Sequence, residues 1–222
     1  LHTASSKGHE AIVRLLLDEG AKVNVQGGRF GNGLQTAIWL GHEAIVRLLL
    51  DKGADVNLRG GKYGNALQAA SSKGHEAIVR LLLEKGAYIN MQGGYYGNAL
   101  PAASSEGYEA IVRLLLDHGT DINIQGGVYG NALQAASSRG HEAIVKLLLH
   151  KGADINMQGG YYGNAPSHTF RLMNTCLRIL YNLPRPKGYA ALLSLFFVGA
   201  SLIVADFIHT NWWRELPLPW LQ

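Results

Sequence analysis

Glycine recurs at a fixed interval through most of this chain. The interval is 33 residues, and it separates Gly31, Gly64, Gly97, Gly130 and Gly163. Most residues between these glycines recur too, so that each copy contains two short helical patterns and then a glycine-rich extended segment. A period of this length is typical of stacked supersecondary units that each contact only their neighbours. We therefore expect a solenoid, and we look for its function on a surface made by repetition.

The second helical pattern of each copy has an apolar side and a charged side. Its apolar stripe is formed by Ile78, Val79, Leu81, Leu82 and Leu83. Glu76 and Arg80 fall four positions apart on the opposite face. We interpret this recurring pair as a solvated ridge, because exposed ion pairs contribute only about 0.3–0.5 kcal/mol each. No single copy can bury its leucines alone, so stability must come from contacts between neighbouring copies.

The repeat resembles the ankyrin family. Gly74, His75 and residues 78–87 match its G-H-x-x-I-V-x-L-L-L-x-x-G-A motif, and residues 53–57 match G-A-D-V-N. The resemblance implies an all-α ankyrin-repeat solenoid made of helix pairs and β-hairpin loops. The family's Thr-Pro-Leu-His is replaced by Asn65-Ala66-Leu67-Gln68, so we expect Asn65 to cap the first helix in place of the usual proline start.

The array is expected to cover residues 1–165 as five helix pairs. The sequence begins inside a repeat, so the first pair is truncated, and we expect the natural array to extend further. Four segments of a different kind follow. They are predicted to be an amphipathic capping helix at 166–183, a stiff basic linker at 184–188, a hydrophobic helix at 189–208 and an aromatic tail at 209–222.

Composition argues against several functional classes. The lone Cys176 in 222 residues rules out an internal disulfide framework and favours a reducing, cytoplasmic location. Residues 1–165 carry 15 Lys and Arg against 14 Asp and Glu, so the net charge of +4 lies mostly in the tail. A near-neutral array lacks the basic stripe of a nucleic-acid binder. We expect a monomeric array that binds no nucleic acid.

Residues that suggest catalysis or metal binding are better explained by the repeat. His75-Glu76 begins like the H-E-x-x-H zinc motif, but Val79 stands where the second histidine is needed. The histidine occurs once in each of four copies, with Tyr108 in its place in the other, and side chains about 8–10 Å apart cannot share one zinc ion. The Gly-Gly-x-x-Gly segments, such as residues 93–97, lack the lysine and the preceding strand of a phosphate loop. We predict no enzyme activity, metal or cofactor.

The hairpin tips and the second copy form the predicted protein-binding surface. Positions that differ between near-identical copies are those that stacking does not dictate, and the tips vary while the next residue stays aromatic. The second copy also has Trp39-Leu40 where another copy has Ser72-Lys73. A large apolar side chain ringed by polar groups is the usual form of an interaction hot spot. The candidate residues are Arg29, Phe30, Thr36, Trp39, Leu40, Lys62, Tyr63, Tyr95, Tyr96 and Tyr129.

Two structural alternatives stay open for these candidates. The aromatic rings would pack against adjacent hairpins and keep the stack in register, or they would contact a partner directly. Trp39 would fold back over its neighbouring helix, or it would stand exposed as an anchor. For the whole array, the resemblance implies a non-catalytic module that binds a partner protein on its concave face. Copies this alike resemble the arrays of fungal NACHT-type ankyrin proteins.

The hydrophobic segment from Tyr189 to Ile208 has three open interpretations. Its first 17 residues carry no charge and span about 25 Å as a helix, which is close to the thickness of a thin bilayer. The first is a membrane anchor that holds the repeats in the cytosol, and the second is a buried helix of a globular cap. The third is a tail without an evolved role, produced by a gene model that runs out of frame after Asn164. The first interpretation gives the alternative function, a membrane-tethered structural scaffold.

Overall fold

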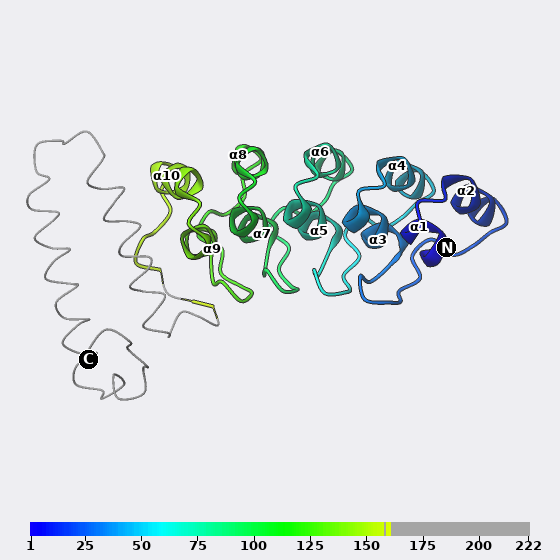
Figure 1. Ribbon diagram of the computed structural model, residues 1–222, viewed down its shortest axis with the longest axis horizontal. Coiled ribbons are helices and arrows are strands. Elements are labelled where there is room, and N and C mark those ends of the chain that lie inside the picture. Colours follow the sequence, from blue (N-terminus) through cyan, green and yellow to red (C-terminus); the bar gives the residue numbers. More distant parts are fainter. Residues whose placement is uncertain (158, 161–222) are drawn as a thin grey trace, which may run out of the picture. The chain divides into compact units, whose positions relative to one another are not determined.

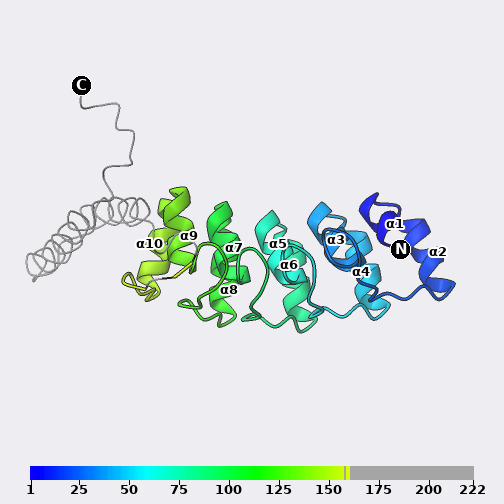
Figure 2. The same cartoon turned by 90° about the horizontal axis from the view of Figure 1, so that it is seen from below.

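The structure is a computed structural model that describes residues 1–157 and 159–160. These residues form ten α-helices in five pairs, which stand side by side along a row (Figures 1 and 2). The first helices of the pairs are α1 (His2–Ser6), α3 (Gly33–Leu40), α5 (Ala66–Lys73), α7 (Ala99–Glu106) and α9 (Ala132–Arg139). The second helices are α2 (Glu10–Asp18), α4 (Glu43–Asp51), α6 (Glu76–Glu84), α8 (Glu109–Asp117) and α10 (Glu142–His150).

The two sets of helices form separate layers. The second helices lie in one layer and the first helices in the other, and the loops between repeats project on the side of the first helices (Figure 1). The described residues contain no β-strand, and isolated β-bridges such as Gly60–Gly64 and Gly93–Gly97 close the loops. The described part of the chain is therefore helical, as the sequence predicts.

Asparagine caps begin four of the first helices, α3, α5, α7 and α9. The Asn65 side chain accepts the backbone N–H of Gln68 at 2.9 Å, and Asn32 and Gln35 form a reciprocal capping box. A glycine in the left-handed region ends α5 two turns later, at Gly74 with φ +75°. The expected cap at Asn65 is confirmed, and it replaces the proline because the asparagine side chain satisfies a backbone donor of the first turn.

The core of the array lies between neighbouring repeats. Ile45 and Leu48 on α4 are 2% and 7% exposed, whereas their counterparts Ile12 and Leu15 on α2 are 48% and 56% exposed. The sequences of α2 and α4 are identical, so the difference comes from the repeat that packs on one side of α4. Burial of the apolar stripe thus depends on a neighbour, as the sequence predicts.

Polar side chains tie each repeat to the next at several levels. Asn57 accepts the backbone N–H of Tyr88 at 2.8 Å and donates to the carbonyl of Gly86 at 3.0 Å. On the outer layer, Lys52 pairs with Asp18 at 2.8 Å, and its hydrogen bond and then its charge lower the pKa of that carboxyl. The ridge pairs within helices, such as Glu76 with Arg80 at 2.7 Å, are half-exposed and add little stability.

The recurring histidine has a packing role. The His75 ring lies against Gly41 of the preceding repeat, and Tyr108 lies in the same way against Gly74. A Cβ at Gly74 would come within 2.6 Å of the tyrosine ring, so glycine provides both the left-handed turn and the space. Burial lowers the pKa of His75, which therefore favours the neutral ring. A tyrosine can take the place because the contact needs a flat ring and no metal-binding nitrogen.

Every prediction for the segment after the array lies outside the described residues. This applies to the capping helix at 166–183, the linker at 184–188, the hydrophobic helix at 189–208 and the aromatic tail at 209–222. Among the residues that the structure does describe, none of the helices is long and apolar enough to cross a membrane.

Candidate functional site

The loops between repeats stack on one another at backbone contact. Gly94 has φ +63°, and a Cβ there would overlap the backbone of Tyr63 in the preceding loop. This close approach allows hydrogen bonds between the tips, from the Tyr95 N–H to the Lys62 carbonyl and from the Val128 N–H to the Tyr95 carbonyl, both at 3.0 Å. The Gly-Gly pair that superficially suggests a phosphate loop therefore serves the contact between neighbouring backbones.

One aromatic residue per loop forms a continuous stack, which we call the aromatic ladder. Its members are Phe30, Tyr63, Tyr96 and Tyr129, and successive ring centroids are 6.5, 6.2 and 6.3 Å apart. The planes of successive rings differ by only 9–17°. The three tyrosines are 6–8% exposed, so only small parts of their rings reach solvent. The packing alternative therefore describes their ring faces correctly.

The hydroxyl groups of Tyr96 and Tyr129 each reach the end of the helix that follows the tyrosine in the chain. The Tyr96 hydroxyl donates to Glu106 at 2.9 Å, and the Tyr129 hydroxyl accepts from Arg139 at 2.9 Å. Because these partners are the last residues of α7 and α9, the tyrosine side chains lie along those helices. Burial raises the pKa of Tyr96, and the nearby Glu106 raises it further. The hydrogen bond to Tyr129 raises the pKa of Arg139.

Trp39 adds a further ring at the N-terminal end of the ladder. Its centroid lies 4.2 Å from that of Tyr63 and 5.4 Å from that of Phe30. The Lys73 ammonium lies 3.5 Å from the centroid of the indole ring. Trp39 remains partly exposed, and the adjacent Leu40 is 43% exposed. The tryptophan is thus held between loops and first helices, and it also contributes to the surface.

The structure brings most of the predicted site residues together. The Arg29 guanidinium lies 6.0 Å from the Phe30 ring centroid, and the Lys62 ammonium lies 5.8 Å from that of Tyr63 and 5.3 Å from that of Tyr95. Tyr95 meets Tyr96 edge-on at 5.0 Å and is 39% exposed. We call this surface the hairpin edge, and we define it as the loop tips, the ladder and the last residues of the first helices.

Thr36 is a correction to the predicted set. Its side chain is fully buried, lies 2.8 Å from His2 in the preceding repeat and donates to the Asn32 carbonyl at 2.8 Å. The equivalent position in the three later repeats is a small buried residue, Ala69, Ala102 or Ala135, because this side of the first helix faces the preceding repeat. Thr36 therefore offers nothing to a partner.

The sequence prediction missed three residues of the hairpin edge, namely Lys73, Glu106 and Arg139. Each is the last residue of a first helix and follows a ladder tyrosine by ten positions. Leu40 occupies the same position after Phe30. The available signal was variation, because this position differs in kind between copies while the serines before it are mostly retained.

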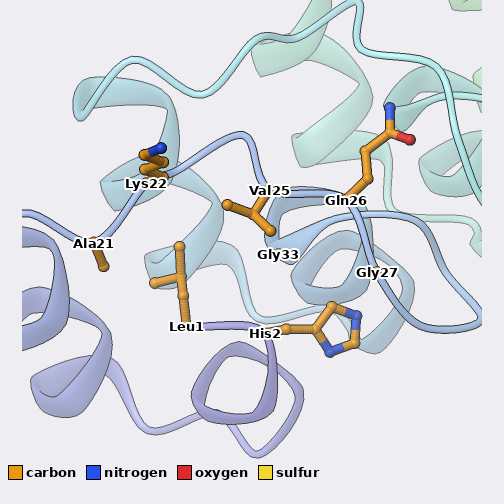
Figure 3. A pocket seen from close by; sticks show the side chains of 8 residues that line it. All are labelled: Leu1, His2, Ala21, Lys22, Val25, Gln26, Gly27 and Gly33. Atoms are coloured by element: carbon orange, nitrogen blue, oxygen red, sulfur yellow. The ribbon is translucent and has the colours of Figure 1, made fainter.

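A cavity of about 310 Å³ lies at the N-terminal end of the array (Figure 3). It is lined by Leu1, His2, Ala21, Lys22, Val25, Gln26, Gly27 and Gly33. Its histidine already contacts Thr36, and the lining offers no nucleophile paired with a base. In the described part of the chain, no three His, Cys, Asp or Glu side chains gather to hold a metal ion. The geometry therefore directs attention to the hairpin edge.

Comparison with known families decides the classification. The family model for ankyrin repeats matches the chain at residues 1–60, 59–126 and 94–159. The chain belongs to the ankyrin repeat family. Ankyrin repeats are generally protein–protein interaction modules and are typically non-catalytic. No curated protein sequence matches this ankyrin chain at a significant level.

Proposed function

We propose that this ankyrin array is a non-catalytic recognition module that binds a partner protein on its hairpin edge. The observation that carries the proposal is the partly exposed Trp39 beside the exposed Leu40. Rigid aromatic side chains supply large contact areas at a low entropic cost, and they are enriched among the residues that dominate binding energy.

Stacking of the repeats does not require the tryptophan. The equivalent positions hold Ser72 and Ser105, and the loops there stack with ring separations of 6.2 and 6.3 Å, slightly closer than the 6.5 Å between Phe30 and Tyr63 beside Trp39. A large aromatic residue that the scaffold does not need, placed at the surface, favours a role in binding. Leu40 strengthens this argument, because leucine replaces the charged residues that end the other complete first helices.

The test compares Trp39→Ser with wild type in the full chain. Serine is the residue that the other repeats carry there, so the variant keeps a side chain that the scaffold accepts. A partner is first captured and purified, and its dissociation constant is then measured by calorimetry. We expect Trp39→Ser to weaken binding by about 30-fold, equivalent to roughly 2 kcal/mol.

The control is Arg80→Gln, on the exposed face of the outer helix α6. It removes one half-exposed ion pair and should leave the affinity within about twofold. Equal affinities of wild type and Trp39→Ser, with both proteins folded by circular dichroism, would remove the tryptophan from the interface. The membrane-tethered alternative depends on residues 189–208, which lie outside the described residues.

A further inference from the structure

The hairpin edge carries cations that no carboxylate neutralises. Among the described residues, Arg29, Lys62 and Lys73 form no ion pair, whereas the eight pairs that are present lie on the second helices and at their ends. Aromatic rings hold these three cations instead, at 6.0, 5.8 and 3.5 Å from the nearest ladder or Trp39 centroid. A ring orients a cation but leaves its charge available.

The carboxylate that the edge does carry lies farther along the row. Glu106 ends α7 and accepts the Tyr96 hydroxyl, and it also lies close to Ser105. The half of the edge around Trp39 is therefore positive, with an apolar centre. Such a surface is complementary to a negatively charged ligand that also offers apolar contact.

The spacing of the edge matches an extended polypeptide. The rings of the ladder recur every 6.2–6.5 Å, and the tips are joined by hydrogen bonds from Lys62 to Arg29 and from Tyr95 to Lys62. A β-strand rises about 3.3 Å per residue and directs alternate side chains to one face, which gives a same-side spacing of about 6.6 Å. One extended chain laid along the row would thus meet each successive repeat with every second residue.

We propose that the hairpin edge binds an extended acidic segment of a partner protein, and this inference rests on the proposed function. Two acidic residues in alternate positions pair with Arg29 and Lys62, and a third alternate residue, which is apolar, packs on Tyr95. Trp39 and Leu40, beside the Lys73 ammonium, contact an apolar side chain of the partner that lies outside this alternating segment. The motif is therefore acidic–x–acidic–x–apolar.

A nucleic acid fits the same surface less well. Bases bind by stacking on an open aromatic face, whereas the ladder tyrosines stack on one another and are 6–8% exposed. Phosphate binding also needs a broad basic surface, and residues 1–165 carry nearly equal numbers of positive and negative side chains. These observations favour a polypeptide, and the experiment includes a nucleic acid as a competing ligand.

The experiment selects short random peptides displayed on phage against the full chain. The selected sequences are then synthesised, and their dissociation constants are measured by fluorescence anisotropy. We expect acidic residues to be enriched at alternate positions, and we expect binding to weaken as salt is raised. Scrambling the sequence of a selected peptide at constant composition should weaken its binding about tenfold, because alternate residues lose their register with the repeats.

Charge reversal on the protein tests the assigned cations. Lys62→Glu should weaken the binding of the acidic peptides about tenfold or more, because it replaces an attraction by a repulsion. Arg80→Gln, on the outer helix, should change the affinity by less than about twofold. Thermal melts of both variants show whether the fold is kept, and Lys62→Gln repeats the test without an added negative charge.

Each other outcome overturns the inference in a distinguishable way. Neutral or basic peptides whose binding still depends on Trp39 would overturn the acidic motif but leave the proposed function intact. Peptides that respond to neither Trp39→Ser nor Lys62→Glu would argue against both. Failure to select any peptide, or tighter Lys62-dependent binding of a short single-stranded DNA, would overturn the polypeptide motif and leave the purified partner to test the function.

Discussion

The close stacking of the loops predicts unequal costs for two glycine substitutions that look alike in sequence. Gly94 and Gly86 are both in the left-handed region, with φ +63° and +83°. A Cβ at Gly94 would overlap the Tyr63 backbone, whereas a Cβ at Gly86 meets nothing within 4 Å. Alanine therefore suffers the same backbone strain at both positions, but it disturbs a neighbouring repeat only at Gly94.

The expected free-energy costs follow from the contacts that each substitution disrupts. A left-handed alanine costs about 1–2 kcal/mol at either position. At Gly94 the loops must also separate, which weakens the hydrogen bond from the Tyr95 N–H to the Lys62 carbonyl at 3.0 Å, worth about 0.5–1.5 kcal/mol. The stacked pair of Tyr63 and Tyr96 loosens as well, at a cost of up to about 1 kcal/mol. We expect Gly94→Ala to cost about 2–4 kcal/mol and Gly86→Ala about 1–2 kcal/mol.

The assay combines a global and a local measurement. Urea denaturation followed by circular dichroism gives the free energy of unfolding for each variant, and amide hydrogen exchange at Tyr95 reports the loop contact itself. Gly94→Ala should accelerate exchange at Tyr95, and Gly86→Ala should not. Costs that agree within about 0.5 kcal/mol, with the same exchange rate at Tyr95, would refute the claim that backbone contact between loops positions the edge.

Two further predictions concern the core and the ladder. Leu48→Ala should lower the free energy of unfolding in urea by about 2–5 kcal/mol, because it opens a cavity between repeats. Leu15→Ala at the exposed counterpart should lower it by less than about 1 kcal/mol. Equal costs would contradict the burial difference. The raised pKa of Tyr96 keeps its hydroxyl protonated in the folded state, whereas the tyrosine of the unfolded chain ionises near pH 10. The free energy of unfolding should therefore fall above pH 10, by up to roughly 1.4 kcal/mol per pH unit from this group. A pH series of urea denaturations should show a shallower fall in Tyr96→Phe, and identical slopes would show that Tyr96 does not contribute.

Much of the fold could be predicted from residues that act locally. The 33-residue period, the asparagine at the start of each complete first helix and the apolar stripe of each second helix require only neighbouring positions in the chain. They predicted the helix pairs and the Asn65 cap that the structure contains. Stacking of the repeats follows as well, because the apolar stripe of a helix such as α6 has no other way to leave water.

The candidate site was less predictable because its geometry depends on distances between repeats. Sequence variation indicated the loop tips and Trp39, but it could not show that Lys73 would lie 3.5 Å from the indole centroid. It also placed Thr36 on the surface, although that side of α3 packs against His2. Periodicity specifies which residues share a helix face, and the neighbouring repeat then determines which face remains exposed.

Separation of stacking from recognition explains how one edge can hold a specific sequence of side chains. The tip residues Arg29, Lys62 and Tyr95 join the stack through their backbone N–H and carbonyl groups, so their side chains can change without removing those bonds. The glycines and ladder rings beside them cannot change as freely, because backbone contact and ring stacking depend on them. Near-identical repeats can therefore carry different charges along a common scaffold, and under the proposed function the order of those charges gives specificity for a partner.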